Sequence, residues 1–190
     1  MTQFSLMHQR RFLPFFLTQF LGAFNDNVYK NALVVLMTFQ AARYTELSAG
    51  VLVNLAAGLF ILPFFLFSAT AGQLADKYEK SHLMRLIKLA EIGIMALAAT
   101  AFALESLPLM LTTLFLMGAQ SSLFGPVKYA ILPQHLAETE LVGGNALVES
   151  GTFIAILIGT IAGGVMIALP GGTMWVSVTV LVLAVAGYFA

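Results

Sequence analysis

The sequence predicts an all-α membrane protein whose chain crosses the bilayer several times. Of its 190 residues, 59% are hydrophobic and only 9% are charged, whereas about 25% of the residues of a soluble domain are charged. A soluble protein of this length needs more charge than this to cover its outside. The apolar runs are too long for the strands of a membrane barrel, and they lack the alternation of strands. A bundle of membrane helices is therefore the fold class that fits.

Six segments are long and apolar enough to cross the hydrocarbon core, which takes about 20 residues. These predicted spans cover residues 12–42, 48–71, 86–104, 107–132, 146–169 and 173–190. Polar residues interrupt the first span, but it is long enough to cross the bilayer with some tilt. The N-terminal stretch has no small-residue cleavage site, so we expect a retained helix and not a signal peptide. The last span is still apolar at Ala190, so we expect the protein to continue beyond it.

The remaining composition argues against several other kinds of function. The net charge is zero, so nothing suggests a nucleic-acid partner. Without cysteine, the chain has no disulfide or thiolate chemistry. His8, His82 and His135 lie apart without the spacing of metal ligands, so we expect neither a metal nor a cofactor. The sequence shows no catalytic triad, phosphate-binding loop or dinucleotide-binding motif, so this segment is not expected to be an enzyme.

The distribution of basic residues predicts that the N-terminus lies in the cytoplasm, because cytoplasmic loops carry an excess of Lys and Arg. With this orientation the outer loops hold only Arg43. The inner side then holds the basic residues Arg10, Arg11, Lys77, Lys80, Arg85 and Lys88. Glu91 follows Lys88 by three residues and is expected to be its structural partner.

A polar cluster lies within the first span. Asp26 is near its middle, where a carboxylate costs at least about 2.5–3.5 kcal/mol. Lys30 lies four residues later on the same helix face and can pair with Asp26, while Asn25, Asn27 and Asn31 add amides. One interpretation is a structural ion pair that neutralises itself. The other is a substrate or ion site at mid-membrane, which we favour because a lone ion pair would not need the asparagines.

Two further groups of residues stand out in the later spans. Lys128, near the cytoplasmic end of the fourth span, could reach the lipid headgroups, pair with Glu149 of the fifth span, or contact a substrate. Pro126 is expected to kink or end the helix nearby. Gly159 and Gly163 form a small-xxx-small face on the fifth span, which lets another helix approach closely. That face could serve packing alone or be the seam along which a transporter moves.

The segment GQLADKYEK between the second and third spans resembles the loop signature of the major facilitator superfamily. The positions that carry the resemblance include Gly72, Asp76, Lys77 and Lys80. The resemblance implies that the chain is the six-helix N-terminal half of a twelve-helix transporter, with the C-terminal half absent. It also implies that these residues form a conformational switch, in which Asp76 pairs across the cytoplasmic helix ends and favours one of two states.

Two further segments, GAFNDN at residues 22–27 and FGPVKYAILP at residues 124–133, are similar to the bacterial lysophospholipid transporter branch of that superfamily. Members of the branch move lysophospholipids from the outer to the inner leaflet of the inner membrane, where an acyltransferase, fused or separate, restores the missing acyl chain. The resemblance implies that Asp26 and Lys128 are polar members of the substrate path. It places Asn25 and Asn27 beside them, and Lys30 is either a ligand or the charge that keeps Asp26 ionised. The implied partners are the lysophospholipid, membrane lipids, the C-terminal half and the acyltransferase.

Two alternatives stay open at this point. The chain could belong to a small-molecule or drug exporter of the same fold, which a dependence on a pH gradient would support. It could also be a membrane anchor for a fused acyltransferase, with no transport of its own. In that case, Asp26 and Lys30 could be replaced by leucine without loss of lipid repair.

Overall fold

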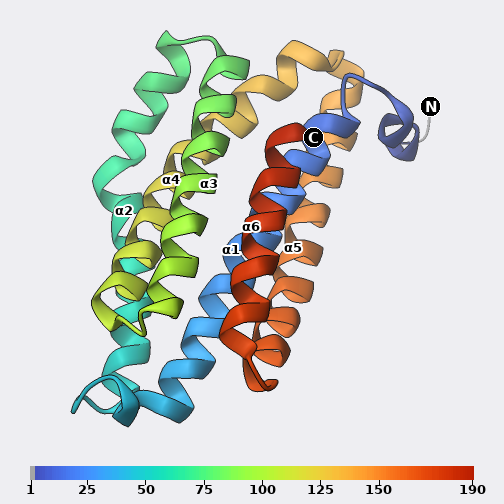
Figure 1. The fold of residues 1–190 in the computed structure, drawn as a ribbon. Helices are drawn as coiled ribbons and strands as arrows, with labels where there is room; N and C mark the ends of the chain where they lie inside the picture. The colour runs from blue at the N-terminus through green and yellow to red at the C-terminus, as the bar shows by residue number, and fades with distance from the viewer. Residues whose placement is uncertain (1–2) are drawn as a thin grey trace.

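The computed structural model describes residues 3–190, and this part of the chain is helical with no strand (Figure 1). The elements in chain order are η1 (Gln3–His8), α1 (Leu13–Gln40), η2 (Ala41–Arg43), α2 (Ala49–Lys77), α3 (Lys80–Ala103), α4 (Leu107–His135), α5 (Glu138–Ala168) and α6 (Gly172–Phe189). The two η elements are short 3-10 helices, and the other six are α-helices of 18 residues or more. The prediction of an all-α fold is confirmed.

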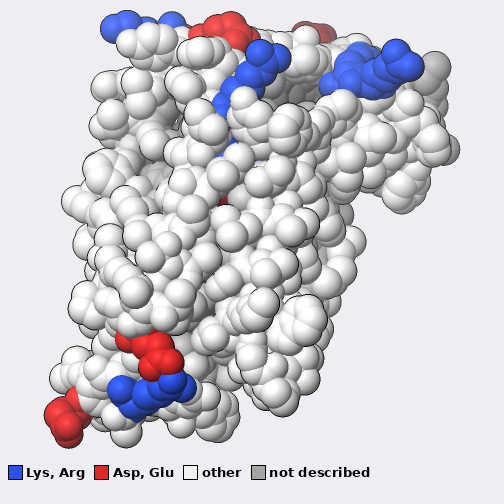
Figure 2. All heavy atoms as spheres, viewed as in Figure 1, with Lys and Arg blue, Asp and Glu red and all other residues white. Residues whose placement is uncertain are grey.

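Five of the described helices, α2 to α6, are long and apolar enough to cross a membrane. Figure 2 shows the charged atoms gathered mainly at the two ends of the molecule, with a largely uncharged belt between them. The chain is therefore a multi-pass membrane protein. Helix α1 has 28 residues, but it is not among those five helices, because polar residues in its middle lower its mean hydropathy. Its place as a sixth span stays a prediction.

The helices pack as two neighbouring groups. Helix α1 packs against α5 and α6, whereas α2 packs against α4, and α3 joins the groups by contacting both α4 and α6. In Figure 1, α1 runs obliquely from the end of the bundle that holds the N-terminus to the opposite end. Helices distant in sequence, such as α1 and α5, therefore lie side by side.

Glycines allow the closest of these contacts. A Cβ atom added to Gly163 would lie 2.2 Å from the carbonyl oxygen of Val28, and one added to Gly159 would lie 2.6 Å from that of Phe24. Both distances are far below van der Waals contact, so only glycine lets the backbone of α5 approach α1 this closely. The expected close approach along the small-xxx-small face is confirmed. Gly118 of α4 meets Phe60 of α2 in the same way, at 2.2 Å from the carbonyl oxygen.

Several helices extend beyond the predicted membrane spans. Helix α2 continues to Lys77 and α3 begins at Lys80, so only Tyr78 and Glu79 separate them. The segment expected to be a charged loop is thus mostly helical. Glu79 caps α3, because its carboxylate accepts hydrogen bonds from the backbone N–H groups of Ser81 (2.9 Å) and His82 (2.6 Å). These bonds lower the pKa of the Glu79 carboxyl.

Helix α4 differs from expectation at its prolines. It continues as one helix to His135 with Pro126 and Pro133 inside it, so the prediction that the helix could end near Pro126 is wrong. A proline inside a helix removes one backbone hydrogen bond. Helix α4 packs against both α2 and α3, so its backbone is supported on two sides.

Candidate functional site

The apolar core of the bundle is interrupted by a polar layer. One buried apolar cluster includes Phe15 and Ile87, and another includes Leu33 and Met95. Between the levels of these clusters, α1, α3 and α4 each carry polar side chains. The buried members of this layer are Gln19, Asn25, Asn27, Lys88, Glu91, Gln120 and Ser122. Burying so many polar groups is costly unless they bond to one another or to a ligand.

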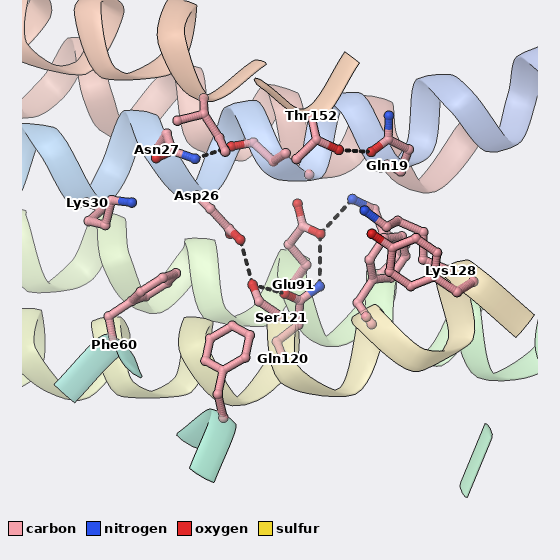
Figure 3. Close-up of a pocket in the computed structure, with 18 residues that line it drawn as sticks. Gln19, Asp26, Asn27, Lys30, Phe60, Glu91, Gln120, Ser121, Lys128 and Thr152 are labelled. Atoms are coloured by element: carbon pink, nitrogen blue, oxygen red, sulfur yellow. Dashed lines mark hydrogen bonds and ion pairs between the residues drawn. The ribbon is translucent and has the colours of Figure 1, made fainter. Parts of the chain in front are cut away.

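A cavity of about 400 Å³ opens in this layer (Figure 3). Its polar and ionisable lining residues are Gln19, Asp26, Asn27, Lys30, Lys88, Glu91, Gln120, Ser121, Lys128, Tyr129 and Thr152. Its apolar lining includes Phe60, Phe64, Phe124 and Ile156. We call it the central cavity. Of the five residues predicted to bind substrate, it brings together Asp26, Asn27, Lys30 and Lys128.

Asp26 faces α4 across the central cavity. Its Oδ2 accepts a hydrogen bond of 2.5 Å from the hydroxyl of Ser121 (Figure 3). Lys30 does not pair with it, because no Asp26–Lys30 ion pair within 4.0 Å occurs among residues 3–190. The Lys30 ammonium instead lies 5.1 Å from the centre of the Phe60 ring, a cation–π contact. The two charges share the cavity wall without neutralising each other directly.

Glu91 is the centre of a second polar network beside Asp26. Its Oε2 lies 2.6 Å from the Lys88 ammonium and accepts a hydrogen bond from Gln120 at 3.2 Å. Its Oε1 accepts one from Asn25 at 3.1 Å. The expected pairing of Lys88 with Glu91 is confirmed. A buried carboxylate is tolerated when it is paired and hydrogen-bonded in this way.

Two sequence interpretations change with this network. Asn25 is fully buried against Glu91 and does not line the central cavity, so its geometry does not support the predicted contact with substrate. The Lys88 side chain is only 3% exposed and must be left out of the basic residues that favour a cytoplasmic N-terminus. Arg10, Arg11, Lys77, Lys80 and Arg85 then stand against Arg43.

Lys128 of α4 is held by Glu149 of α5 and by the neighbouring Tyr129. Its Nζ lies 3.3 Å from Oε1 of Glu149 and 4.7 Å from the centre of the Tyr129 ring. The Tyr129 hydroxyl also donates a hydrogen bond to Glu149. The Lys128 side chain is 12% exposed, so its ammonium turns toward a carboxylate and the cavity rather than out to the headgroups.

The predicted switch residues lie apart from the central cavity. Gly72, Asp76 and Lys77 belong to the last turns of α2, and Lys80 is the first residue of α3. None of the four lines the central cavity. They lie where the two helices meet at one end of the bundle, and their role as a conformational switch stays a prediction.

Gln120 and Ser121 are functional candidates that received no role from the sequence. Their signal is visible only in part, as polar residues in the middle of an apolar span. What makes them a site is their meeting with α1 and α3, which depends on the packing of the bundle. Within residues 3–190, no group of three His, Asp or Glu side chains lies close enough to hold a metal ion.

The site can accept a ligand with charges of both signs. Three cations, Lys30, Lys88 and Lys128, line the central cavity with two carboxylates, Asp26 and Glu91. Lys88 and Lys128 are already paired with carboxylates, whereas Lys30 and Asp26 have no ion-pair partner among the described residues. With the phenylalanine wall, this arrangement suits an amphiphile.

Comparisons with known proteins agree with this architecture. The family model described as Major Facilitator Superfamily matches residues 15–190. The chain is similar to proteins named lysophospholipid transporter LplT from Escherichia coli O1:K1 / APEC, Escherichia coli K12 / DH10B and Shigella boydii serotype 18. Each match is 34% identical over 148 residues and covers 78% of this chain but 34% of the relative. The chain thus spans about a third of the length of these relatives, and no solved structure matches it. From the family match and the helical membrane fold together, the chain belongs to the major facilitator superfamily of membrane transporters.

Proposed function

We propose that this chain is the N-terminal half of a lysophospholipid transporter and that the central cavity holds the lipid headgroup. The observation that carries the proposal is that a single cavity contains side chains of both charge signs and an aromatic wall. Asp26, Lys30 and Lys128 supply the charges, while Phe60 and Phe64 supply apolar surface. The name of the similar relatives, lysophospholipid transporter, supports the same substrate class.

The headgroup fits the charges as follows. The phosphate of a lysophospholipid meets the ammonium group of either Lys30 or Lys128, because charge-assisted hydrogen bonds are stronger than neutral ones. The ammonium of an ethanolamine headgroup meets Asp26, and a glycerol headgroup donates its hydroxyls to the same carboxylate. Asn27 lies beside Asp26 on the cavity wall. Because Lys30 is not paired with Asp26, we assign it as a ligand rather than a structural partner.

Transport proceeds by alternating access between this half and the C-terminal half of the full protein. The single acyl chain stays against apolar side chains while the headgroup crosses in the polar cavity. We propose the bacterial inner membrane as the location, movement from the outer to the inner leaflet as the direction, and a cytoplasmic N-terminus, with α1 as the sixth span. Gly72, Asp76, Lys77 and Lys80 act as the switch at the cytoplasmic ends of α2 and α3. Re-acylation of the delivered lipid falls to an acyltransferase, fused or separate.

The test is uptake of labelled lysophosphatidylethanolamine by the full-length protein in proteoliposomes. Asp26→Asn keeps the size of the side chain and one acceptor oxygen but removes its charge. We therefore expect at least a tenfold loss of uptake, the value of one charge-assisted contact. Glu46→Gln is the matched control, because Glu46 is an exposed acid outside the cavity. A normally expressed Asp26→Asn protein with wild-type uptake would overturn the assignment.

The same assay separates the two alternatives. If the protein is a drug exporter, the wild type would take up no lysophospholipid. It would instead export drugs when a pH gradient is applied. A non-transporting anchor would support re-acylation in cells even when Asp26 and Lys30 are both replaced by leucine.

A further inference from the structure

A second cavity, of about 350 Å³, lies between the N-terminal segment, the first turns of α1 and the ends of α3, α4 and α6. Residues 187–190, at the C-terminal end of α6, form part of its wall. Both ends of the described chain lie near this part of the bundle (Figure 1). Its charged and imidazole lining residues are all of the basic kind: Arg10, Arg11, Arg85, Lys88 and His135. No Asp or Glu belongs to its lining. We call it the basic cavity.

The arginines of the basic cavity differ in whether their side chains already bond to other residues. Arg11 is engaged, since its guanidinium donates to both carboxylate oxygens of Glu140 at 2.7 and 2.8 Å and to the carbonyl of His135 at 2.8 Å. Arg10 and Arg85 make no side-chain hydrogen bond or ion pair with any residue in the range 3–190. Two guanidinium groups are thus available to a ligand.

Lys88 joins the basic cavity to the central one, because it lines both. Glycines on two other helices leave space for its ammonium group. A Cβ atom on Gly187 of α6 would lie 2.8 Å from the Lys88 ammonium, and one on Gly22 of α1 would lie 3.3 Å from it. The two glycines therefore leave room for the buried Lys88 ammonium at the boundary between the two cavities. There it is held by Glu91 at 2.6 Å.

We propose that the basic cavity binds a phosphate-class anion, either inorganic phosphate or the phosphate of a lipid headgroup, between Arg10 and Arg85 with Lys88 at its inner end. Planar guanidinium groups bind phosphate oxygens in pairs, and a lysine adds a point charge. The anion competes with Glu91 for the Lys88 ammonium. This site is distinct from the headgroup position proposed above, and it does not depend on transport.

The test measures equilibrium binding to the purified full-length protein in detergent, at constant ionic strength set with chloride. The two ligands are inorganic phosphate and a soluble short-chain phosphatidylglycerol. We expect at least one of them to bind, with affinity about tenfold lower or worse in Arg10→Gln and in Arg85→Gln, as for loss of a charge-assisted contact. Glu91→Gln should raise the affinity several-fold, because it releases Lys88 from its carboxylate. Binding of both ligands assigns the site to phosphate in general, and binding of the lipid alone assigns it to headgroups.

Two control variants locate the binding. Arg43→Gln removes a cation from the connection between α1 and α2, which does not line the basic cavity, so it should bind as the wild type does. Lys128→Gln disables the proposed headgroup site and should leave the Arg85-dependent binding in place, which separates failure of this site from failure of the transport proposal. Because Arg10 and Arg85 are exposed, their variants should fold normally by size-exclusion chromatography. Absence of binding by both ligands, or binding unchanged in Arg10→Gln and Arg85→Gln, would overturn the proposal.

Discussion

The contact between α5 and α1 gives the sharpest test of the packing. In Gly163→Ala, the new methyl group would lie 2.2 Å from the carbonyl oxygen of Val28 and 3.0 Å from its carbonyl carbon and its Cα. All three atoms are backbone, so no rotamer change relieves the clash. To restore a contact of at least 3.0 Å, the helices must separate locally by nearly 1 Å.

The size of the effect follows from two opposing terms. Overpacking of this kind costs about 1–3 kcal/mol, while alanine gains about 0.8–1.0 kcal/mol over glycine in helix propensity. The neighbouring Gly164→Ala has the same propensity gain, but its methyl group would make an ordinary contact of 3.8 Å with a side-chain carbon of Val35. The two alanine variants should therefore differ in free energy of unfolding by about 1–3 kcal/mol, with Gly163→Ala the less stable.

The assay is chemical unfolding of the purified full-length variants in the same detergent, followed by helix content. The comparison of adjacent glycines on one helix cancels propensity, expression and detergent effects. If Gly163→Ala proves as stable as Gly164→Ala, the close approach of α1 and α5 does not constrain the bundle as described.

Three further predictions concern the polar groups. Ser121→Ala removes the hydrogen bond to Asp26 and should lower the free energy of unfolding by about 1–3 kcal/mol, measured by the same unfolding assay, with lysophospholipid uptake reduced as well. Lys128→Glu and Glu149→Lys should each destabilise the protein by breaking their ion pair, and the double exchange should recover much of the loss in a double-mutant cycle. In Glu79→Gln, the free energy of unfolding should lose the part of its pH dependence that comes from the α3 cap. The pKa of Glu79 is lowered in the folded state, so its contribution is present above the unfolded pKa and fades as the pH falls through the folded pKa.

Each of these has its own control. Ser122→Ala removes a hydroxyl that bonds only to the carbonyl of Ala119 in its own helix, so it should affect uptake much less than Ser121→Ala; equal loss would contradict the role of Ser121. A double exchange no more stable than either single would mean that Lys128 and Glu149 do not stabilise one another. For Glu79, a variant that loses stability in parallel with the wild type at every acidic pH would show that the cap does not titrate.

Helices α2 to α6 could be predicted from hydropathy, because a span must stay apolar over about 20 residues. Helix α1 could be predicted from the length of its segment despite the polar residues in its middle. The ends of the helices could not. Helix α5 begins at Glu138 and α2 continues to Lys77, well outside their apolar stretches. A helix can extend past the hydrocarbon, where polar side chains cost nothing, so hydropathy measures the lipid-facing length rather than the helix.

Site residues could be predicted from the sequence where a single side chain is energetically costly inside a span. The contact of Asp26 with a side chain of a different helix could not be predicted. Asp26 stands out from the sequence because a carboxylate inside a span needs a reason, and it does line the central cavity. Its contact with Ser121 joins residues 95 positions apart, which no spacing within one helix can indicate. For the same reason, proximity in sequence made Lys30 look like the partner of Asp26, while the fold directs Lys30 to Phe60 instead.

The continuity of α4 through Pro126 has a mechanical consequence. Because proline carries no N–H, the carbonyl of Ser122, four residues earlier, lacks its usual helical donor. Bending the helix at this level breaks one hydrogen bond fewer than it would elsewhere, and prolines are common places for helices to bend. Gln120 and Ser121 lie next to this level, so a bend of α4 here would move Ser121 relative to Asp26. The level at which α4 bends most easily is therefore close to the Asp26–Ser121 contact.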